Sequence, residues 1–431
     1  MLDIKFVREN PELVQQKSTE KGYSVDVAAT LALDAAHRAL LIEVENLRHE
    51  RNELAASMKS VKPSEEQIAK GRELKDKLTG LEAELKATEA TFLAAFKKIP
   101  NMPAEDVPVG ASEDENMVVK EVGERPDFAF APKNHWQIGE ARGWIDKERA
   151  TKVAGARFAY LKGDLVKLEW ALMQYAMDIL TDEALLAKII AGAGLSVSPK
   201  AFTPVLPPLM IRTEPYDAMD RLEPREERYK IEGEELWLQG SAEHVLGSMH
   251  ADEIFDEADI PVRYVGFATS FRREAGSYGK DMEGIIRLHQ FNKLEMESFS
   301  TKETSLEEHK LLVAIQEYFV QSLGLPYRFV MKCTADIGKP NARGVDIDTW
   351  LPGQGKYRET HTADYMADYQ ARRLNTRVRR KSGDVELIHT NDATMSSERP
   401  LIAILENYQQ EDGSIAIPDV LQPYMHGRRV I

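Results

Sequence analysis

Apolar residues recur every seven positions between residues 25 and 100, in two runs separated by Pro63. In the first run, one row is Leu33, Leu40, Leu47, Leu54 and Val61, and the companion row includes Val44 and Met58. In the second run, one row is Leu78, Leu85, Phe92 and Ile99, and the other begins with Leu74 and Leu81.

Ser64 and Gln67 form a capping-box pattern that starts the second helix. Two such stripes joined by a short turn predict an antiparallel two-helix coiled coil. At ~1.5 Å per residue each helix would be about 50 Å long. His37, Arg51 and Thr88 interrupt the companion rows, so local packing should be loose.

The charge of this helical pair leaves two interpretations open. Residues 26–100 hold 12 basic and 13 acidic side chains, whereas the whole chain carries a formal charge of −15. The pattern alone fits an oligomerisation coiled coil equally well. A nearly neutral arm on an acidic body is also compatible with an RNA contact along one face.

The pattern changes after the second helix. Residues 100–132 are rich in proline, acidic and small residues, with little periodicity, which predicts a linker. Leu165–Leu180 is amphipathic and predicts a helix, and the apolar run that follows predicts a strand bearing Pro207 and Pro208. Proline within a strand favours an edge or an interface, because it has no amide donor.

Two segments separated by a glycine-containing stretch form the most informative part of the chain. The first contains Arg272 and Glu274, and the second contains Arg287 and Phe291. Gly276, Gly279 and Gly284 lie between them. If the flanks pair as a β-hairpin, both arginines can reach one triphosphate, because each guanidinium donates paired hydrogen bonds and stays charged.

Size and composition limit the classes of protein. A chain of 431 residues with 43 % hydrophobic content supports two or three domains. The charge of −15 argues against a protein that binds nucleic acid over its whole surface. The single cysteine, Cys333, excludes an internal disulfide framework and a thiol-rich zinc site. The N-terminal residues mix charged with apolar side chains, and no apolar run approaches the length of a membrane span, so we expect a cytoplasmic protein.

The arginine-containing segments resemble motif 2 of the class II aminoacyl-tRNA synthetases, and in detail that of the seryl-tRNA synthetases. The opening LDIKFVRENPE followed by a helical hairpin, and the helix ILENYQ near residue 404, extend the resemblance over nearly the whole chain. It implies an α+β fold, with an antiparallel β-sheet core flanked by helices and an N-terminal antiparallel helical coiled-coil arm. The implied domains are a tRNA-binding arm at 1–105 and a catalytic domain at 106–431. The Leu165–Leu180 helix and the following strand resemble motif 1, which builds the dimer interface in that family and implies a homodimer.

The resemblance implies a function in protein biosynthesis. A member of this family activates L-serine with ATP to seryl-adenylate and pyrophosphate, then transfers serine to the 3′ end of tRNA(Ser), with tRNA(Sec) as a further acceptor. The arm would grip the long variable arm of the tRNA. Candidate contacts are the outward basic residues Arg48, Lys59, Lys75 and Lys86, although each is also a normal solvated side chain.

The ATP-binding residues are carried over position by position. The resemblance places Arg272 at the α-phosphate and Arg287 near the γ-phosphate. Glu274 would accept from the adenine amino group, and Phe291 would stack on the base. Arg399 matches the arginine of motif 3, and Arg272 and Arg399 are the candidate catalytic residues. The alternative for a single pair is an ordinary Arg–Glu salt bridge across the hairpin.

The serine pocket requires an anion for the ammonium group and partners for a small hydroxyl. By resemblance it would contain Ser241, Glu243, Arg272, Glu295 and Thr394. The family usually has threonine where this chain has Ser241. Without the family context, Glu243 and Glu295 could equally be surface charges.

A further stretch, GKYRETHT, resembles the segment that holds Mg²⁺ in this family. Glu359 would ligate the ion bridging the phosphates, and Thr362 would assist. His361 stands beside them, but a lone histidine is more often structural. Downstream, Arg377 and Arg379 alternate within a basic run, which predicts a strand with one basic face. That face could meet the tRNA acceptor end or pair with acidic side chains.

The motif 3 segment departs from the family pattern. Its loop is one residue shorter, Asp392 stands where the family has asparagine, and Glu398 replaces the glycine before the arginine. These changes question the geometry of ATP binding more than the class of reaction. Two other functions stay open: a synthetase-like protein that loads a molecule other than tRNA, and a non-catalytic scaffold.

Overall fold

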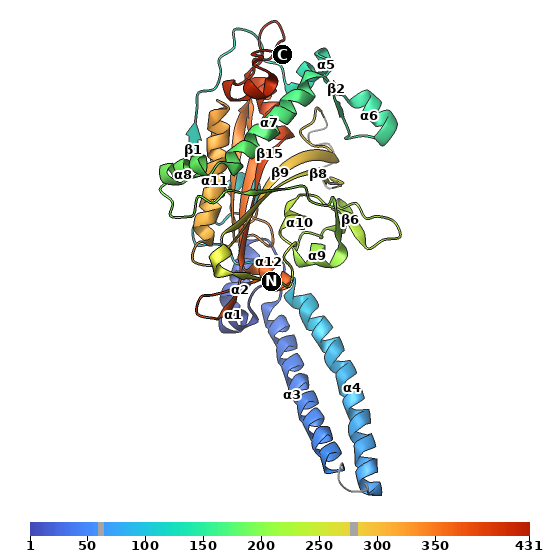
Figure 1. Cartoon of the computed structure of the whole chain (residues 1–431). Helices are drawn as coiled ribbons and strands as arrows, with labels where there is room; N and C mark the ends of the chain where they lie inside the picture. Colours follow the sequence, from blue (N-terminus) through green and yellow to red (C-terminus); the bar gives the residue numbers. More distant parts are fainter. Residues whose placement is uncertain (59–63, 276–282) are drawn as a thin grey trace. The chain divides into compact units, whose positions relative to one another are not determined.

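A computed structural model describes residues 1–58, 64–275 and 283–431 (Figure 1). The chain divides into two compact units, Met1–Met102 and Pro103–Ile431, which are described separately. Val61, Pro63 and Lys59 of the predicted coiled coil lie outside the described residues, as do Gly276, Ser277 and Gly279 of the arginine-containing segment.

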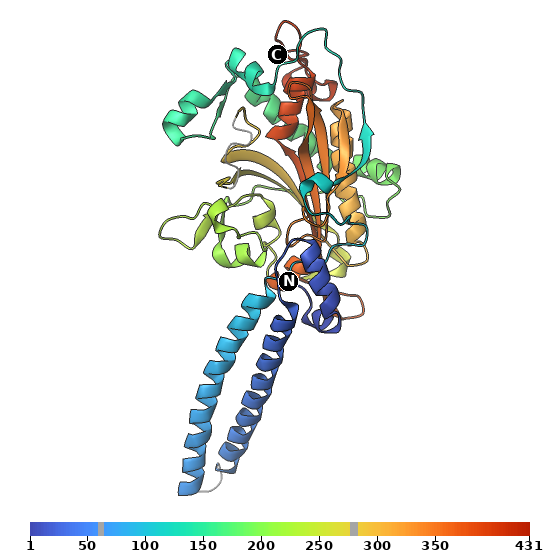
Figure 2. The same ribbon diagram turned by 180° about the vertical axis from the view of Figure 1, so that it is seen from behind.

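The first unit is helical. Its elements are α1 (Ile4–Glu9), α2 (Pro11–Glu20), α3 (Val27–Ser57) and α4 (Glu65–Phe96). The side chain of Asp26 caps α3 by accepting from the amide of Ala29 at 2.8 Å. Ser64 and Gln67 form the predicted capping box at the start of α4. Figures 1 and 2 show α3 and α4 running side by side as the predicted hairpin.

The seam between α3 and α4 follows the predicted heptads. Val44 and Leu47 of α3 are buried against Leu74 and Leu78 of α4. One interruption of the seam is accommodated by ring stacking, since His37 lies parallel to a phenylalanine, Phe92, with 6.0 Å between ring centroids. The short helices α1 and α2, which sequence periodicity did not reveal, belong to the same unit.

The second unit is built on an eight-stranded sheet in the order β1-β10-β11-β12-β15-β9-β8-β4. All neighbouring strands are antiparallel except β4, which pairs parallel with β8. The strands are β1 (Met117–Val122), β4 (Thr203–Val205), β8 (Val262–Phe271), β9 (Gln290–Ser300), β10 (Tyr327–Met331), β11 (Arg343–Leu351), β12 (Lys356–Ala367) and β15 (His389–Ser397). This large, mainly antiparallel sheet flanked by helices confirms the predicted fold class.

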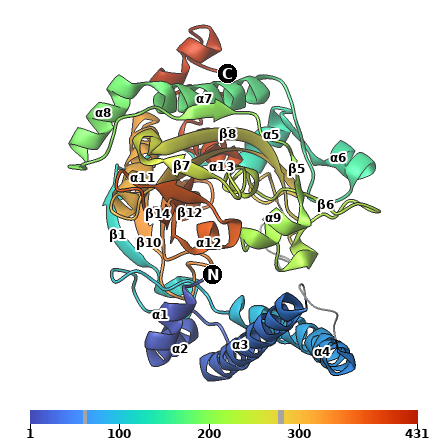
Figure 3. The same cartoon turned by 60° about the horizontal axis from the view of Figure 1, so that its bottom comes forward.

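Smaller elements surround this sheet. Its helices are α5 (His135–Ala141), α6 (Lys147–Ala154), α7 (Asp164–Thr181), α8 (Glu183–Gly192), α9 (Thr213–Ala218), α10 (Glu243–Leu246), α11 (Ser305–Ser322), α12 (Tyr369–Leu374) and α13 (Glu398–Asn407). Short strands are β2 (Ile145–Asp146), β3 (Tyr160–Leu161), β5 (Met210–Arg212), β6 (Leu236–Leu238), β7 (Ile254–Asp256), β13 (Arg377–Arg379) and β14 (Val385–Leu387). In Figure 3, α7 lies along the outer side of β8, where the rings of Trp170 and Phe267 are 6.0 Å apart.

The two faces of the sheet differ in chemistry because strand residues alternate. On β9, Leu294 and Met296 point into the main hydrophobic core with α7, α11 and α13. Glu295 and Glu297 therefore point to the opposite face. The same alternation on β12 and β15 puts carboxylates and threonines on that second face. The second face of the sheet is therefore lined by polar side chains.

Two expectations about the region before the motif 2 hairpin need correction. The segment predicted as a linker contains β1, an edge strand paired with β10. It escaped notice because five of its six residues are exposed, so no alternation of burial marks it. Pro207 and Pro208 lie between β4 and β5 instead of within a strand. No helix among the described residues is both long and apolar enough to cross a membrane.

Candidate active site

The predicted hairpin is formed by β8 and β9, which pair from Val262↔Phe299 to Phe271↔Gln290. Pairing continues one step further, because the amide of Arg272 donates to the carbonyl of His289 at 2.9 Å. Arg272 and Arg287 therefore both lie in the segment that connects β8 to β9. Gly284, on the returning segment, has a φ of +66°, and a Cβ there would lie 1.9 Å from a ring nitrogen of buried His135. Glycine is needed at this position both for its backbone conformation and for space.

A cavity of about 270 Å³ opens beside this hairpin. It is bounded by β9, β12, β15 and the start of α13. Eight of the residues singled out from the sequence line it: Arg272, Glu274, Arg287, Phe291, Glu359, Thr362, Thr394 and Arg399. Residues separated by more than a hundred positions in the chain are thus brought to one polar cavity.

Two arginines of the cavity are ion-paired with carboxylates that line it. Arg287 donates to Glu274 at 2.5 Å, and Arg399 lies 2.8 Å from a carboxylate oxygen of Glu359. The Arg287–Glu274 pair is the salt bridge that the simpler interpretation of the hairpin predicted. Partial loss of hydration at the cavity wall opposes ionisation of Glu359, whose side chain is 46 % exposed, but the charges of Arg399 and Lys332 outweigh this effect and lower the pKa of Glu359 to about 2. Glu359 is therefore a carboxylate at neutral pH.

Arg272 occupies a different environment. Its Nε donates to the carbonyl of Gly240 at 3.0 Å, and its guanidinium carbon lies 5.3 Å from the ring centroid of Phe291. Burial and the nearby charge of Arg228 lower the pKa of Arg272 below its ordinary value, although arginine stays charged at neutral pH. Because these contacts fix the base of its side chain, Arg272 can direct the rest of its guanidinium toward an anion.

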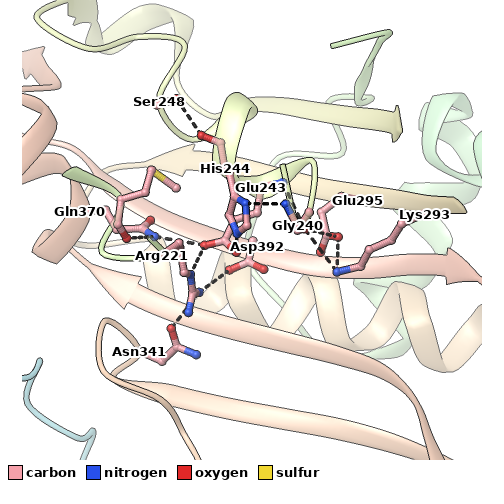
Figure 4. A network of polar contacts seen from close by, with 12 residues as sticks. Arg221, Gly240, Glu243, His244, Ser248, Lys293, Glu295, Asn341, Gln370 and Asp392 are labelled. Atoms are coloured by element: carbon pink, nitrogen blue, oxygen red, sulfur yellow. Dashed lines mark hydrogen bonds and ion pairs between the residues drawn. The ribbon is translucent and has the colours of Figure 1, made fainter. Parts of the chain in front are cut away.

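The remaining three predicted residues, Ser241, Glu243 and Glu295, form a buried network next to the cavity. Figure 4 shows Glu243 and Glu295 with their partners. Ser241 donates to Glu295 at 3.0 Å, and Lys293 makes an ion pair with the same carboxylate. Glu243, at the start of α10, accepts from Arg221 at 2.6 Å and from Gln370 at 3.1 Å. Glu243 and Glu295 are 5 % and 0 % exposed, so the interpretation of these residues as surface charges is wrong.

Sequence reasoning missed three residues that organise this network. Arg221 joins Glu243 to Asn341 and lies 3.7 Å from Asp392. Gln370 and Lys293 also contribute, as described above. Lys293 lies two residues from both Phe291 and Glu295 on β9 and therefore shares their face of the sheet. This spacing could have identified Lys293 as a site residue. Arg221 lies in a turn after α9, where no sequence pattern points to a role.

Glu398, one of the departures in motif 3, lines the cavity but is itself buried. Its carboxylate accepts from the backbone amide of Asn292 at 2.5 Å, and the side chain of Asn292 donates to Glu169. Burial and the neighbouring Glu169 raise the pKa of Glu398 to about 8. Glu398 is therefore mostly protonated at neutral pH, and it contacts β9 instead of its neighbour Arg399.

The possible metal ligands are few. Within residues 1–58, 64–275 and 283–431, no group of three or more His, Cys, Asp or Glu side chains is arranged to hold a metal ion. His361 is buried, contacts Thr360 at 2.9 Å, and has a pKa lowered to about 3 by burial. It is therefore a neutral residue of the fold and points away from the cavity face of β12.

The basic run forms α12 and the strand β13, with Val378 buried between Arg377 and Arg379. Several of its arginines contact acidic groups. Arg373 pairs with Asp217 and Asp220, and Arg380 lies near three glutamates. On the predicted basic face itself, Arg379 lies 3.9 Å from Asp256, so pairing with acidic side chains, one of the two interpretations of this face, is present in the fold.

Comparison with known proteins gives consistent matches over both units. Residues 1–103 match the seryl-tRNA synthetase N-terminal domain, and residues 227–408 match the tRNA synthetase class II core domain (G, H, P, S and T). The serine–tRNA ligase of Thermodesulfovibrio yellowstonii is 40 % identical over 99 % of both chains. That of Geobacter sulfurreducens is 39 % identical over the full length of both.

Solved structures show the same similarity. The seryl-tRNA synthetase from Pyrococcus horikoshii complexed with ATP is 37 % identical, with a TM-score of 0.88 over 100 % of this chain and 99 % of that one. The cytoplasmic serine–tRNA ligase from Naegleria fowleri in complex with AMP is 29 % identical, with a TM-score of 0.84 over 100 % and 98 % of the two chains.

Proposed function

Because the chain belongs to the seryl-tRNA synthetase family, and is thus an ATP-dependent serine–tRNA ligase, we propose that its polar cavity forms seryl-adenylate. The observation that carries this assignment is the convergence of Arg272, Arg287 and Arg399 on one cavity. Three arginines in one partly enclosed space fit the charge of a triphosphate.

The chemistry needs positioning and charge more than a base. The serine carboxylate is ionised at neutral pH, so one of its oxygens attacks the α-phosphorus of ATP directly. A new acyl–oxygen–phosphorus bond forms, the bond to the bridging oxygen breaks, and pyrophosphate leaves. In our proposal Arg272 and Arg399 stabilise the charge on the phosphates, as preorganised cations do in phosphoryl-transfer sites.

The other ATP contacts follow from the lining of the cavity. Arg287 binds the γ-phosphate end, Phe291 stacks on the adenine, and Glu274 accepts from its amino group. Binding would require Arg287 and Arg399 to exchange their carboxylate partners for phosphate oxygens. Glu274 would then be released to read the base, and Glu359 would be released at the phosphates.

The released carboxylate suits a magnesium ion that arrives with ATP. Glu359 is ionised, and the hydroxyl-bearing side chain of Thr362 lines the same cavity. One carboxylate and one hydroxyl are hard oxygen ligands, and phosphate oxygens and water would complete the six that Mg²⁺ prefers. Bound there, Mg²⁺ would neutralise charge on the phosphates.

Serine recognition is assigned to the buried network. Ser241, Glu295 and Thr394 offer polar partners to a small amino acid, and Glu243 offers a negative charge to its ammonium group. Arg272 is close enough to this network, through Gly240, to contact the serine carboxylate as well. Loss of the hydroxyl, as in alanine, would leave buried groups unpaired, which disfavours alanine.

Transfer of serine to the tRNA is assigned to both units. The arm of α3 and α4 would bind tRNA(Ser), with Arg48, Lys75 and Lys86 exposed on it. Arg48 already pairs with Glu82 at 2.7 Å, so it would have to exchange partners. Charging of tRNA(Sec) and a location in the cytoplasm remain predictions. Parallel charging of the two tRNA transcripts tests the first of these.

The proposal also includes a homodimer. Trp170 on α7 is 63 % exposed and Leu206, after β4, is 84 % exposed. An apolar hollow of about 400 Å³ lies beside Trp170 and is partly lined by Tyr424 and Met425. Large apolar side chains grouped near a sheet edge fit a protein–protein interface.

Serine-dependent exchange between ATP and pyrophosphate, measured without tRNA, tests the central assignment. We expect exchange with serine, and little with alanine, threonine or glycine. Absence of exchange with every amino acid would refute adenylate formation and favour the scaffold interpretation.

A further inference from the structure

The polar face of the sheet contains a row of three buried carboxylates beyond the cavity. Asp364 on β12 is directly opposite Asp392 on β15, and Asp392 is directly opposite Glu297 on β9. All three are at most 7 % exposed. Like charges directly opposite one another in a sheet repel, so this row needs a physical reason.

The row is continuous with the predicted serine pocket. Thr362 and Thr394 line the cavity, and Asp364 and Asp392 are the next residues on the same face of their strands. On β9, Glu297 follows Glu295 in the same way. The row therefore lies directly behind the two threonines of the cavity wall.

Positive charge in this region falls short of negative charge. The acidic side chains of the row and its surroundings are Glu243, Glu295, Glu297, Asp346, Asp364 and Asp392. The cationic side chains paired with them, within the part of the chain that the structure describes, are Arg221, Lys293 and Lys332. Among the described residues, none of these three cations makes an ion pair with Glu297.

Several of these carboxylate oxygens also lack hydrogen-bond donors. Among the described residues, neither oxygen of Glu297 has a partner, and one oxygen each of Asp364 and Asp392 is also without one. Burial and the charges of the neighbouring acids raise the pKa values of Glu297 and Asp392 well above their ordinary values. A buried polar group without a partner is costly, so a ligand that brings several donors and positive charge would be bound strongly.

An ammonium group has both properties, because it carries one positive charge and three donors. The hydroxyl of serine supplies one donor and no charge. The α-ammonium group of any amino acid is already assigned to Glu243 and its surroundings. The row therefore matches a second ammonium group, one carbon further along the substrate.

On these grounds we propose that the carboxylate row binds a side-chain ammonium, so that the site activates small amino acids with a β-amino group, such as L-2,3-diaminopropionate, in addition to serine. This inference rests on the proposed adenylate-forming function. The reaction at the substrate carboxylate is unchanged: its oxygen bonds to the α-phosphorus, pyrophosphate leaves, and the side-chain ammonium keeps its protons.

The experiment measures ATP–pyrophosphate exchange of the full chain with L-serine, L-2,3-diaminopropionate and L-alanine. We expect exchange with the first two. Asp392→Asn keeps the size of the side chain but removes the acidic group that would ionise beside the ammonium. It should lower kcat/KM for diaminopropionate relative to serine by about tenfold or more, the usual effect of losing a charged hydrogen bond.

Two controls make the result specific. Asp127→Asn removes an equal charge from an exposed position and should leave the ratio of the two substrates unchanged. Asp364→Asn, in the same row, should shift the ratio in the direction of Asp392→Asn, and thermal unfolding verifies that both row variants are folded.

The possible outcomes separate this inference from the proposed function. Exchange with serine and none with diaminopropionate overturns the inference alone. Exchange with both substrates at a ratio unaffected by Asp392→Asn and Asp364→Asn overturns the role of the row. Absence of exchange with either substrate overturns both the inference and the adenylate-forming function.

Discussion

In our proposal phosphate binding depends most on Arg272, because among the three cavity arginines it has no ion pair with a described carboxylate of the cavity. We expect Arg272→Ala to lower serine-dependent exchange by about 100-fold or more, as loss of one preorganised donor to a transition-state charge does. The melting temperature should change little. Arg51→Ala, an exposed arginine of α3, is the matched control and should retain full exchange. Unaltered exchange in Arg272→Ala would exclude its assignment to the phosphates.

We expect the titration of Glu398 to make the free energy of unfolding depend on pH. Its pKa in the folded protein is raised to about 8, whereas an unfolded glutamate titrates near 4.3. Between these values the folded state holds a proton that the unfolded state has lost. Stability from this group is therefore fully present below about pH 4.3 and is lost as the pH rises toward 8, by up to about 1.4 kcal/mol per pH unit.

Glu398→Gln removes this titration and keeps an oxygen for the amide of Asn292. We expect the variant to gain stability over the natural chain as the pH rises from 6 to 8, measured by urea unfolding at each pH. Because other buried acids titrate in both proteins, only the difference between the two curves is diagnostic. A difference that is constant with pH would mean that Glu398 is ionised in the folded state.

The helical arm should be dispensable for serine activation. Its seam is complete without the catalytic unit, and none of its residues lines the cavity. Deletion of residues 30–98 should therefore leave serine-dependent exchange within about twofold of the full chain. Charging of tRNA(Ser) should fall by at least about 100-fold if, as we propose, the arm supplies contacts that position the tRNA. An equal loss of both activities would refute this division of labour.

Sequence periodicity predicted elements where each buried face lies within one local segment. The heptads of α3 and α4, the capping box at Ser64 and the helix α7 all have this property, since the helical period can be read directly. β1 could not be found in this way, because its exposed residues give no pattern and its partner β10 lies about 200 residues further along the chain.

Residues of the candidate site could likewise be predicted only where they lie in short, recognisable segments. Motif-bearing residues such as Arg272 and Arg399 could be selected from short segments and then found in one cavity. Arg221 could not, because its partners Glu243, Asn341 and Asp392 come from three separate segments that meet only in the folded chain. The strand register that aligns Asp364, Asp392 and Glu297 is likewise a property of the sheet, although each acid was visible in the sequence.

The exposed apolar side chains around α7 lead us to expect a dimer. Trp170 and Leu206 expose large apolar surfaces on a chain whose net charge of −15 otherwise keeps copies apart. Light scattering after size exclusion should give a mass of about 97 kDa, twice the 48.7 kDa of one chain.

Trp170→Glu should shift the protein toward 48.7 kDa, because a charge buried at an interface without a partner is unfavourable. Val153→Glu places the same charge at an equally exposed apolar position on α6 and should leave the mass at the dimer value. If both variants remain dimeric, the interface lies elsewhere, and a single-chain mass for the natural protein would exclude the homodimer altogether.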